Sequence, residues 1–203
     1  MHLGADIIKG ILRLLALQPL KWHYFWGKCI AWIVRVPLRY RKDVVMINLA
    51  RSFPEKKYRE LEDIAVKFYG HLGRIIAETV WFAGSYMKNR LEDSGICHYS
   101  NLEALSELFD KAPSVMLMTS HAGNWEILGG CMHYRSLTKS GTFSFTEDEI
   151  SIVYKELSNK TMDRVMRHNR CTPVKADWSI CCVESKDIMR FVVAHRNKKR
   201  IYC

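Results

Sequence analysis

The chain has 203 residues and 48% of them are hydrophobic, so it is long enough to bury a proper core within one domain. Its seven cysteines are odd in number and form no Cys-x-x-Cys pair, which argues against a disulfide framework and favours a reducing compartment. The formal net charge is +10, and residues 1–60 carry twelve Lys and Arg against four Asp and Glu, a net of +8. The basic character therefore belongs to the N-terminal end.

The first 36 residues combine this positive charge with two apolar helical stripes. One stripe ends at Leu20 and the next begins at Trp22, and both are interrupted by cations. No window holds the ~20 nearly uncharged residues of a spanning helix, and no signal-peptide cleavage site follows. Cations beside Trp, Phe and Leu are typical of helices that lie in the headgroup region of a membrane. We therefore predict a membrane-associated helical segment over 1–36, which Pro37 ends, on an anionic membrane.

Two other interpretations of this segment stay open. The aromatic stripe could form the core of a pair of helices, because apolar stripes on helices of soluble chains are usually core. The basic excess could serve nucleic acid, but the cations interleave with bulky aliphatic side chains, and no nucleic-acid fold signature is present. We therefore expect no nucleic-acid partner.

Helical and strand patterns alternate through the rest of the chain. Helices are predicted at 41–53, 55–82, 101–109, 125–135, 158–168 and 185–195. Strands are predicted at 97–99, 114–119, 150–154 and 172–175, and residues 201–202 resemble the opening of another. Strands that alternate with helices indicate an α/β layer.

A seven-residue motif over 120–126 reads Ser-His-Ala-Gly-Asn-Trp-Glu and follows the strand predicted at 114–119. That strand is a short apolar run, and we expect it to be buried. Asn124 is predicted to cap the next helix, which places Glu126 in its first turn, where the free N–H groups favour a carboxylate. Residues five apart do not share a helix face, so a contact between His121 and Glu126 needs the intervening turn.

A histidine beside a carboxylate can remove the proton from a hydroxyl group. Neutral histidine, whose ordinary pKa is near ~6.5, accepts that proton, and a carboxylate on its other nitrogen fixes the tautomer and stabilises the imidazolium. The spacing alone also fits a structural arrangement in which His121 bonds a loop carbonyl and Glu126 caps its helix. No Gly-x-Ser-x-Gly elbow, phosphate-binding glycine loop or His-Glu-x-x-His pattern is present, which disfavours hydrolases, nucleotide binders and zinc sites.

Residues around the motif extend the pattern in both directions. A lead-in block lies within 40–74, and a second block over 153–164 contains Tyr154-Lys155-Glu156. Together with His-Ala-Gly-Asn-Trp-Glu, these blocks resemble the bacterial lipid A biosynthesis acyltransferases, the lauroyl and myristoyl transferase family. The second block of that family usually reads Tyr-Arg/Lys-Pro, and here Glu156 replaces the proline. Members of that family continue into a strand with an Asp-Gln segment, whereas this sequence stops at Cys203. We therefore expect a fragment or a truncated copy that is less stable than an extended form and inactive.

The resemblance implies transfer of a fatty acyl group from a thioester of acyl carrier protein to a hydroxyl of a glycolipid such as a lipid A precursor. His121 would deprotonate the acceptor hydroxyl, and Glu126 would orient His121 and stabilise its charge. Asn124, Lys155 and Arg164 would bind substrate, the two cations by holding a phosphate or the developing oxyanion. For Lys155 and Arg164 a solvated helix face is an equally open interpretation. We expect no metal or organic cofactor, because the thioester already supplies an activated carbonyl.

The resemblance also implies a fold and a location. The fold is an α/β arrangement with a glycerolipid-acyltransferase-like mixed sheet flanked by helices, and the acyltransferase domain covers 37–203 on the cytoplasmic side of the inner membrane. Two alternatives remain: a lysophospholipid or aminolipid O-acyltransferase, which would use the same pair of residues, and a catalytically inactive membrane protein.

Overall fold

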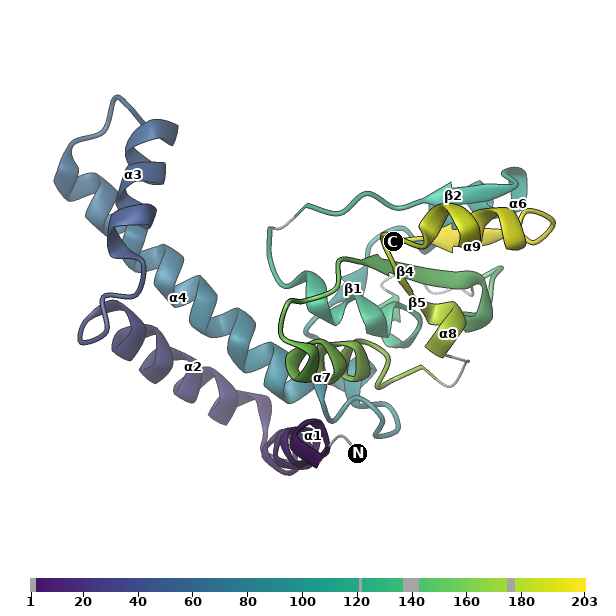
Figure 1. Ribbon diagram of the computed structural model, residues 1–203, viewed down its shortest axis with the longest axis horizontal. Helices are drawn as coiled ribbons and strands as arrows, with labels where there is room; N and C mark the ends of the chain where they lie inside the picture. The colour runs from purple at the N-terminus through teal and green to yellow at the C-terminus, as the bar shows by residue number, and fades with distance from the viewer. Residues whose placement is uncertain (1–2, 121, 137–142, 175–177) are drawn as a thin grey trace.

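The computed structural model describes residues 3–120, 122–136, 143–174 and 178–203. A helical arm extends from an α/β layer (Figure 1). The helices are α1 (Leu3–Ala16), α2 (Leu20–Arg35), α3 (Lys42–Ser52), α4 (Tyr58–Phe82), α5 (Arg90–Ser94), α6 (Leu102–Lys111), α7 (Lys160–Arg170), α8 (Trp178–Cys181) and α9 (Ile188–Ala194), with 3-10 helices η1 (Trp125–His133) and η2 (Glu147–Glu149). The strands are β1 (His98–Tyr99), β2 (Ser114–Met116), β3 (Arg135–Ser136), β4 (Ile150–Tyr154), β5 (Cys182–Glu184) and β6 (Arg200–Tyr202).

The larger sheet has the strand order β2-β6-β4-β5, and β1 pairs with β3 separately. The last strand, β6, lies between β2 and β4, and its Ile201 is aligned with Val115 on one side and Ile150 on the other. Every pairing made by the described residues is parallel, because a long connection returns the chain to the same end of the sheet each time. The predicted α/β class is confirmed, and the sheet is parallel where a mixed one was expected.

Two predicted strands differ from the structure. The strand expected to be buried over 114–119 is the short edge strand β2, and its Met116 is 71% exposed. The strand predicted over 172–175 is wrong for the described residues 172–174, since the chain turns there and Val174 N–H donates to the Cys171 carbonyl. Lys175 lies outside the described residues. The position beside β4 is taken by β5 instead.

The arm depends on a close crossing of α2 and α4, which lie side by side in Figure 1. Gly27 of α2 faces Gly73 of α4, and a Cβ atom at Gly27 would lie 2.6 Å from the Gly73 carbonyl oxygen. Ala31 and Ala77 follow one turn further along each helix and contact the opposing glycine. Small residues on both helices therefore let the two backbones approach one another.

We expect Gly27→Ala to lower the free energy of unfolding by about 1–3 kcal/mol, because the new methyl group meets backbone atoms that cannot move aside. Gly70→Ala is the matched control, since it lies on α4 with open space around its Cβ position. For that variant the free energy of unfolding should rise by roughly 0.5–1 kcal/mol, because alanine has a higher helix propensity than glycine. Urea unfolding of both variants measures the difference, and stabilisation by both substitutions would show that the crossing tolerates a methyl group.

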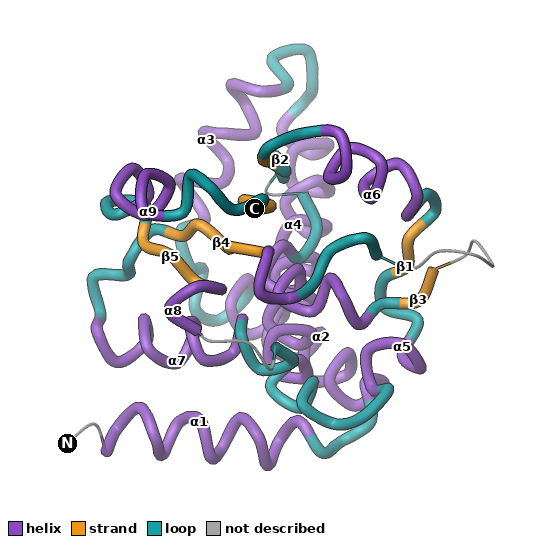
Figure 2. The backbone as a smooth tube through the Cα atoms, turned by 90° about the vertical axis from the view of Figure 1, so that its right-hand side faces the viewer, coloured by secondary structure: helices purple, strands orange, loops and turns teal. Residues whose placement is uncertain are grey.

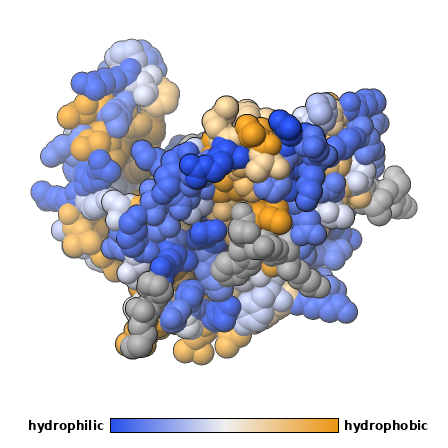
Figure 3. All heavy atoms as spheres, turned by 45° about the vertical axis from the view of Figure 1, so that its right-hand side comes forward, coloured by the Kyte–Doolittle hydropathy of each residue, from blue (hydrophilic) through white to orange (hydrophobic). Residues whose placement is uncertain are grey.

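The apolar side chains of α1 and α2 lie largely on the outside of the molecule. Ile7, Leu14, Trp22 and Trp26 are each more than half exposed, and small residues make the packing contacts instead. Apolar atoms lie among polar ones on the protruding lobe of the arm (Figure 3). In the described parts of the chain, we find no helix that is both long and apolar enough to cross a membrane.

The first helix also contacts the α/β layer. α1 runs along one side of this layer, next to α7 (Figure 2). Arg13 of α1 donates a hydrogen bond to Nε2 of His168 on α7, at 3.1 Å. Burial and the neighbouring cations Arg13 and Lys9 lower the pKa of His168 to about 4, so this histidine is neutral at physiological pH and accepts the bond. The N-terminal helices are thereby attached to the domain that carries the motif.

Candidate active site

The motif over 120–126 follows β2 at the carboxyl edge of the parallel sheet. Leu117 N–H donates to the Tyr202 carbonyl at 2.8 Å, and Ala122 N–H donates to Ser120 Oγ at 3.3 Å. His121 lies outside the described residues, so its contact with Glu126 stays a prediction. Lys155 follows β4 at the same edge, which is where open parallel sheets bind ligands.

Asn124 attaches the motif to α4. Its Oδ1 accepts the N–H of Glu126 at 3.2 Å, which confirms the predicted cap. Its Nδ2 donates to Oε2 of Glu78 at 3.1 Å and to the Ile75 carbonyl at 3.4 Å. Both ends of this amide are engaged within the protein, so Asn124 positions the start of η1, and its role in substrate binding stays a prediction.

The Glu78 carboxylate, which accepts the hydrogen bond from Asn124, is buried where α2 and α4 pack together. Glu78 of α4 accepts a hydrogen bond from the Tyr24 hydroxyl of α2 at 3.0 Å, and Arg74 Nε lies 4.0 Å from the same Oε1. Burial and the charge of Glu78 raise the pKa of Tyr24 to about 12, so the phenol remains a donor. Through Glu78, the arm and the motif share one hydrogen-bond network.

Glu126 forms a buried bidentate ion pair with Arg170 at the end of α7. Arg170 Nε donates to Oε2 at 2.7 Å and Nη2 donates to Oε1 at 2.8 Å, and the two side chains are only 11–15% exposed. Burial lowers the pKa of Arg170, but the hydrogen bond and the charge of Glu126 outweigh this, so the pKa is raised overall. The Cζ atom of Arg170 also lies 5.3 Å from the centre of the Tyr154 ring.

This ion pair determines what Glu126 can do chemically. A carboxylate offers about four lone-pair sites, so the two bonds from Arg170 leave capacity for one more donor, such as a histidine N–H. The paired bonds from the guanidinium also hold the Glu126 carboxylate in one orientation. The arrangement can therefore fix a neighbouring base in one tautomer.

The two predicted substrate-binding cations lie at the surface. Lys155 is exposed directly after β4, and Arg164 is exposed on α7. Glu156, which replaces the usual proline, accepts hydrogen bonds from Lys160 at 2.6 Å and from Lys186 at 3.4 Å. Because Lys155 and Arg164 are exposed, both are accessible to a phosphate and to water, and their roles stay predictions.

Comparison with known proteins establishes the family of the chain. A family model described as bacterial lipid A biosynthesis acyltransferase matches residues 3–172. The chain belongs to this family. The match runs from α1 to just past α7 and includes both the motif and Arg170. No curated protein and no solved structure matches the chain.

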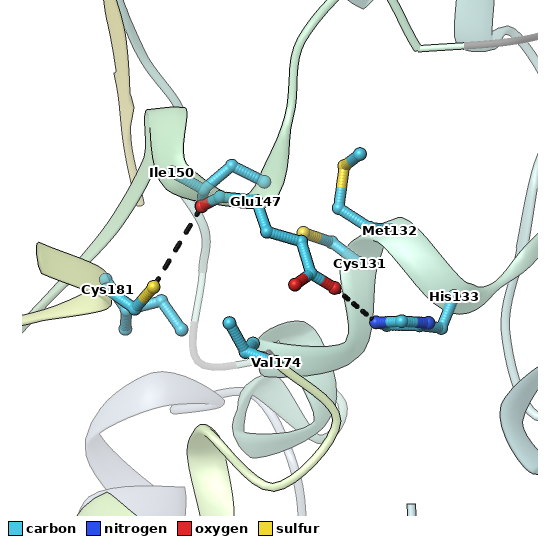
Figure 4. Close-up of a pocket in the computed structure, with 9 residues that line it drawn as sticks. Cys131, Met132, His133, Glu147, Ile150, Val174 and Cys181 are labelled. Carbon is cyan, nitrogen blue, oxygen red and sulfur yellow. Dashed lines mark hydrogen bonds and ion pairs between the residues drawn. The ribbon is translucent and has the colours of Figure 1, made fainter. Parts of the chain in front are cut away.

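A small apolar pocket of this acyltransferase lies behind η1 (Figure 4). At one side His133 of η1 and Glu147 point toward one another, with 2.7 Å between Nε2 and Oε1. Cys131 and Cys181 also line the pocket, and burial raises their pKa values to about 12 and about 11, so both are thiols. Its volume of about 20 Å³ has room for roughly one water molecule. An acyl chain does not fit there in this conformation.

Sequence reasoning missed Glu78 and Arg170 in this acyltransferase. Glu78 interrupts the apolar stripe of α4 between Ile75 and Val80, and a carboxylate on an apolar helix face is a signal for a buried partner. Arg170 lies in a basic run at the end of α7, where a favourable helix dipole explains a cation without any site.

Within the described ranges, no three His, Cys, Asp or Glu side chains gather into a metal site.

Proposed function

We propose that this acyltransferase moves a fatty acyl group from the thioester of acyl carrier protein to a hydroxyl of a lipid A precursor or a related glycolipid. The observation that carries the proposal is the Glu126–Arg170 ion pair, which fixes the carboxylate at the end of the motif, beyond the carboxyl edge of the sheet. Glu126 lies five positions after His121, the proposed base. Lys155 and Arg164 are proposed to bind the acceptor phosphate or the oxyanion.

The proposed step needs only the thioester and the acceptor. His121 takes the proton of the acceptor hydroxyl as its oxygen forms a bond to the thioester carbonyl carbon, and Glu126 stabilises the imidazolium. The tetrahedral intermediate then collapses, the carbon–sulfur bond breaks, and the imidazolium returns the proton to the leaving thiolate. The thioester is already activated, so the proposed transfer uses no metal or organic cofactor.

A transfer assay with purified protein tests this proposal. The protein is supplied with an acyl carrier protein thioester and either a lipid A precursor, a lysophospholipid or no acceptor, and the acylated product is measured. The inactivity expected from the sequence predicts no product from this chain. The proposed transfer predicts product with the lipid A precursor and little thioester loss without an acceptor. Product with the lysophospholipid alone would assign the acceptor to the other lipid class, and loss of thioester without any acylated lipid would contradict transfer.

We further propose that α1 and α2 attach the protein to the cytoplasmic face of the anionic inner membrane, where a lipid acceptor resides. Exposed apolar side chains on α1 and α2 and the net charge of +8 over 1–60 support this attachment. Each cation near such a surface contributes roughly 1 kcal/mol, and each buried large apolar side chain about 1.5–3 kcal/mol.

We expect serine substitution of Ile7, Leu14, Trp22 and Trp26 to reduce partition into anionic vesicles at least ~10-fold, because losing one buried side chain already costs about 1.5–3 kcal/mol. These positions are exposed, so the helix packing at Gly27 is untouched, whereas deletion of 1–36 would remove it. Vesicle flotation at low salt measures the effect.

The matched control carries serine at four exposed apolar positions elsewhere, namely Tyr58, Leu108, Met189 and Val193. We expect the control to float like the wild type. Equal losses in both variants, or a wild-type chain that does not float, would show that these faces of α1 and α2 do not bind the membrane.

A further inference from the structure

A cleft of about 410 Å³ lies where the end of α2, the helix α3 and the first half of α4 meet. Its size falls within the range of about 300–1,000 Å³ that small-molecule sites occupy. The cleft is at the arm, away from the α/β layer that carries the motif (Figure 1).

The two walls of the cleft carry opposite charges. Arg35 at the end of α2, Arg39 in the following turn and Lys42 at the start of α3 form the basic wall. Glu62 and Asp63 of α4 form the acidic wall. Lys42 Nζ lies 3.8 Å from Glu62 Oε1, which joins the walls at one point. A ligand that carries a negative and a positive charge a few atoms apart is complementary to this arrangement.

The basic wall is held in place by the turn between α2 and α3. Arg39 adopts a left-handed backbone with φ of +45°, a conformation that non-glycine residues adopt only where the surroundings require it. The turn is fixed by the bond from Tyr40 N–H to the Val34 carbonyl at 3.0 Å. The buried Tyr69 of α4 lines the cleft and donates to the Tyr40 carbonyl at 2.7 Å. The backbone of Arg39 is thus set before any ligand arrives.

Apolar side chains lie between and beside the charged walls. Val36, Val45 and Met46 line the cleft, and the neighbouring Trp32 and Leu38 are exposed at 58% and 65%. A free inorganic anion would contact only the basic wall and would leave these side chains unused. The surface of an acidic protein would meet carboxylates on α4. A lipid headgroup that carries both charges, with its glycerol and first methylenes on the apolar side chains, satisfies all three features.

We infer that this cleft binds the phosphoethanolamine headgroup of a membrane phospholipid, with the phosphate on Arg35 and Arg39 and the ammonium on Asp63 and Glu62. The inference rests on the membrane attachment in the proposed function and adds the lipid class and the binding position. Arginine suits the phosphate because its planar donors form paired charge-assisted bonds. The primary ammonium donates three hydrogen bonds to carboxylates, which a trimethylated amine cannot do.

Vesicle flotation tests the inference with lipids that differ only in the amine. Vesicles of phosphatidylcholine are compared with vesicles in which half is replaced by phosphatidylethanolamine, so both are uncharged overall. We expect the wild type to prefer the latter at least ~10-fold, the effect of one charge-assisted hydrogen bond. Arg35→Gln with Arg39→Gln should abolish the preference. Arg51→Gln with Arg59→Gln removes the same charge from exposed positions outside the cleft and should keep it.

A soluble headgroup separates this inference from membrane attachment itself. Calorimetry with glycerophosphoethanolamine and glycerophosphocholine should show a preference for the former, which Asp63→Asn weakens, with unchanged thermal midpoints as the check on folding. If the soluble headgroup binds but the protein does not float with vesicles, headgroup binding in the cleft is supported and the membrane attachment is contradicted. Equal binding of both headgroups, equal binding of inorganic phosphate, or equal losses in the two charge-matched variants would overturn the inference. If the variant without Arg35 and Arg39 keeps the ethanolamine preference but no longer binds acyl carrier protein, the inference is overturned. The cleft would then be assigned to the surface of an acidic protein.

Discussion

His121→Ala is expected to lower kcat/KM for acyl transfer by about 10²–10⁴-fold, the contribution of a general base. We expect the thermal midpoint to stay close to that of the wild type, because Asn124 and Glu126 anchor the described part of this loop. Steady-state transfer from acyl carrier protein to the lipid acceptor measures the effect.

His133→Ala is the matched control, since His133 lies in η1, directly after the motif, and its Nε2 is 2.7 Å from Oε1 of Glu147. It borders a pocket too small for an acyl chain, and we expect transfer to stay near the wild-type rate. Normal turnover with His121→Ala would exclude the proposed mechanism. Loss of turnover with His133→Ala alone would move the general base to the His133–Glu147 pair.

Arg170→Met is expected to lower the free energy of unfolding by about 3–5 kcal/mol, because it leaves Glu126 as a buried charge without its guanidinium. Glu126→Gln should destabilise the protein in the same way from the other side. The double variant Glu126→Gln with Arg170→Met removes both charges, so we expect it to recover most of the loss. Urea unfolding of the wild type and the three variants forms a double-mutant cycle that isolates the coupling.

The same variants separate structural from catalytic effects of Glu126. The double variant should be stable but slow in acyl transfer, because His121 loses the carboxylate that is proposed to orient it. Arg170→Lys keeps the charge without the paired donors and should fall between the wild type and Arg170→Met in stability. If the single and double variants lose stability additively, the ion pair has no coupling energy and cannot be what holds Glu126 in position.

The elements that local pattern determines were predicted from the sequence. The long apolar stripe of α4 and the β-branched run of β4 are strong periodic signals, and both elements form where they were expected. The strand predicted at 172–174 does not form, because the N–H groups of Thr172 and Val174 donate to carbonyls of Asn169 and Cys171. In a strand these N–H groups would have donated to a neighbouring strand. β5 has only three residues, which is too short to show a period.

In the candidate site, too, local contacts were predicted from the sequence and distant ones were not. The Asn124 cap depends on residues two apart and was predicted, whereas its bond to Glu78 and the Glu126–Arg170 pair join residues 46 and 44 positions apart. The sequence signals that Glu78 has a buried partner, but the identity of such a distant partner appears only once the chain is folded. The aromatic residues of α2 had two open interpretations, and the structure exposes Trp22 and Trp26 because Gly27 makes the packing contact instead.

The central place of β6 in the sheet has a consequence for synthesis of the protein. More than eighty residues separate β2 from β6, so at ~5–20 residues/s the ribosome works for roughly 4–17 s between them. During that time β2 and β4 have no strand between them, and both expose unpaired N–H and C=O groups to other nascent chains. Newly made chains are therefore most prone to aggregate just before Ile201 enters the sheet, and a chaperone that shields strand edges would act in this interval.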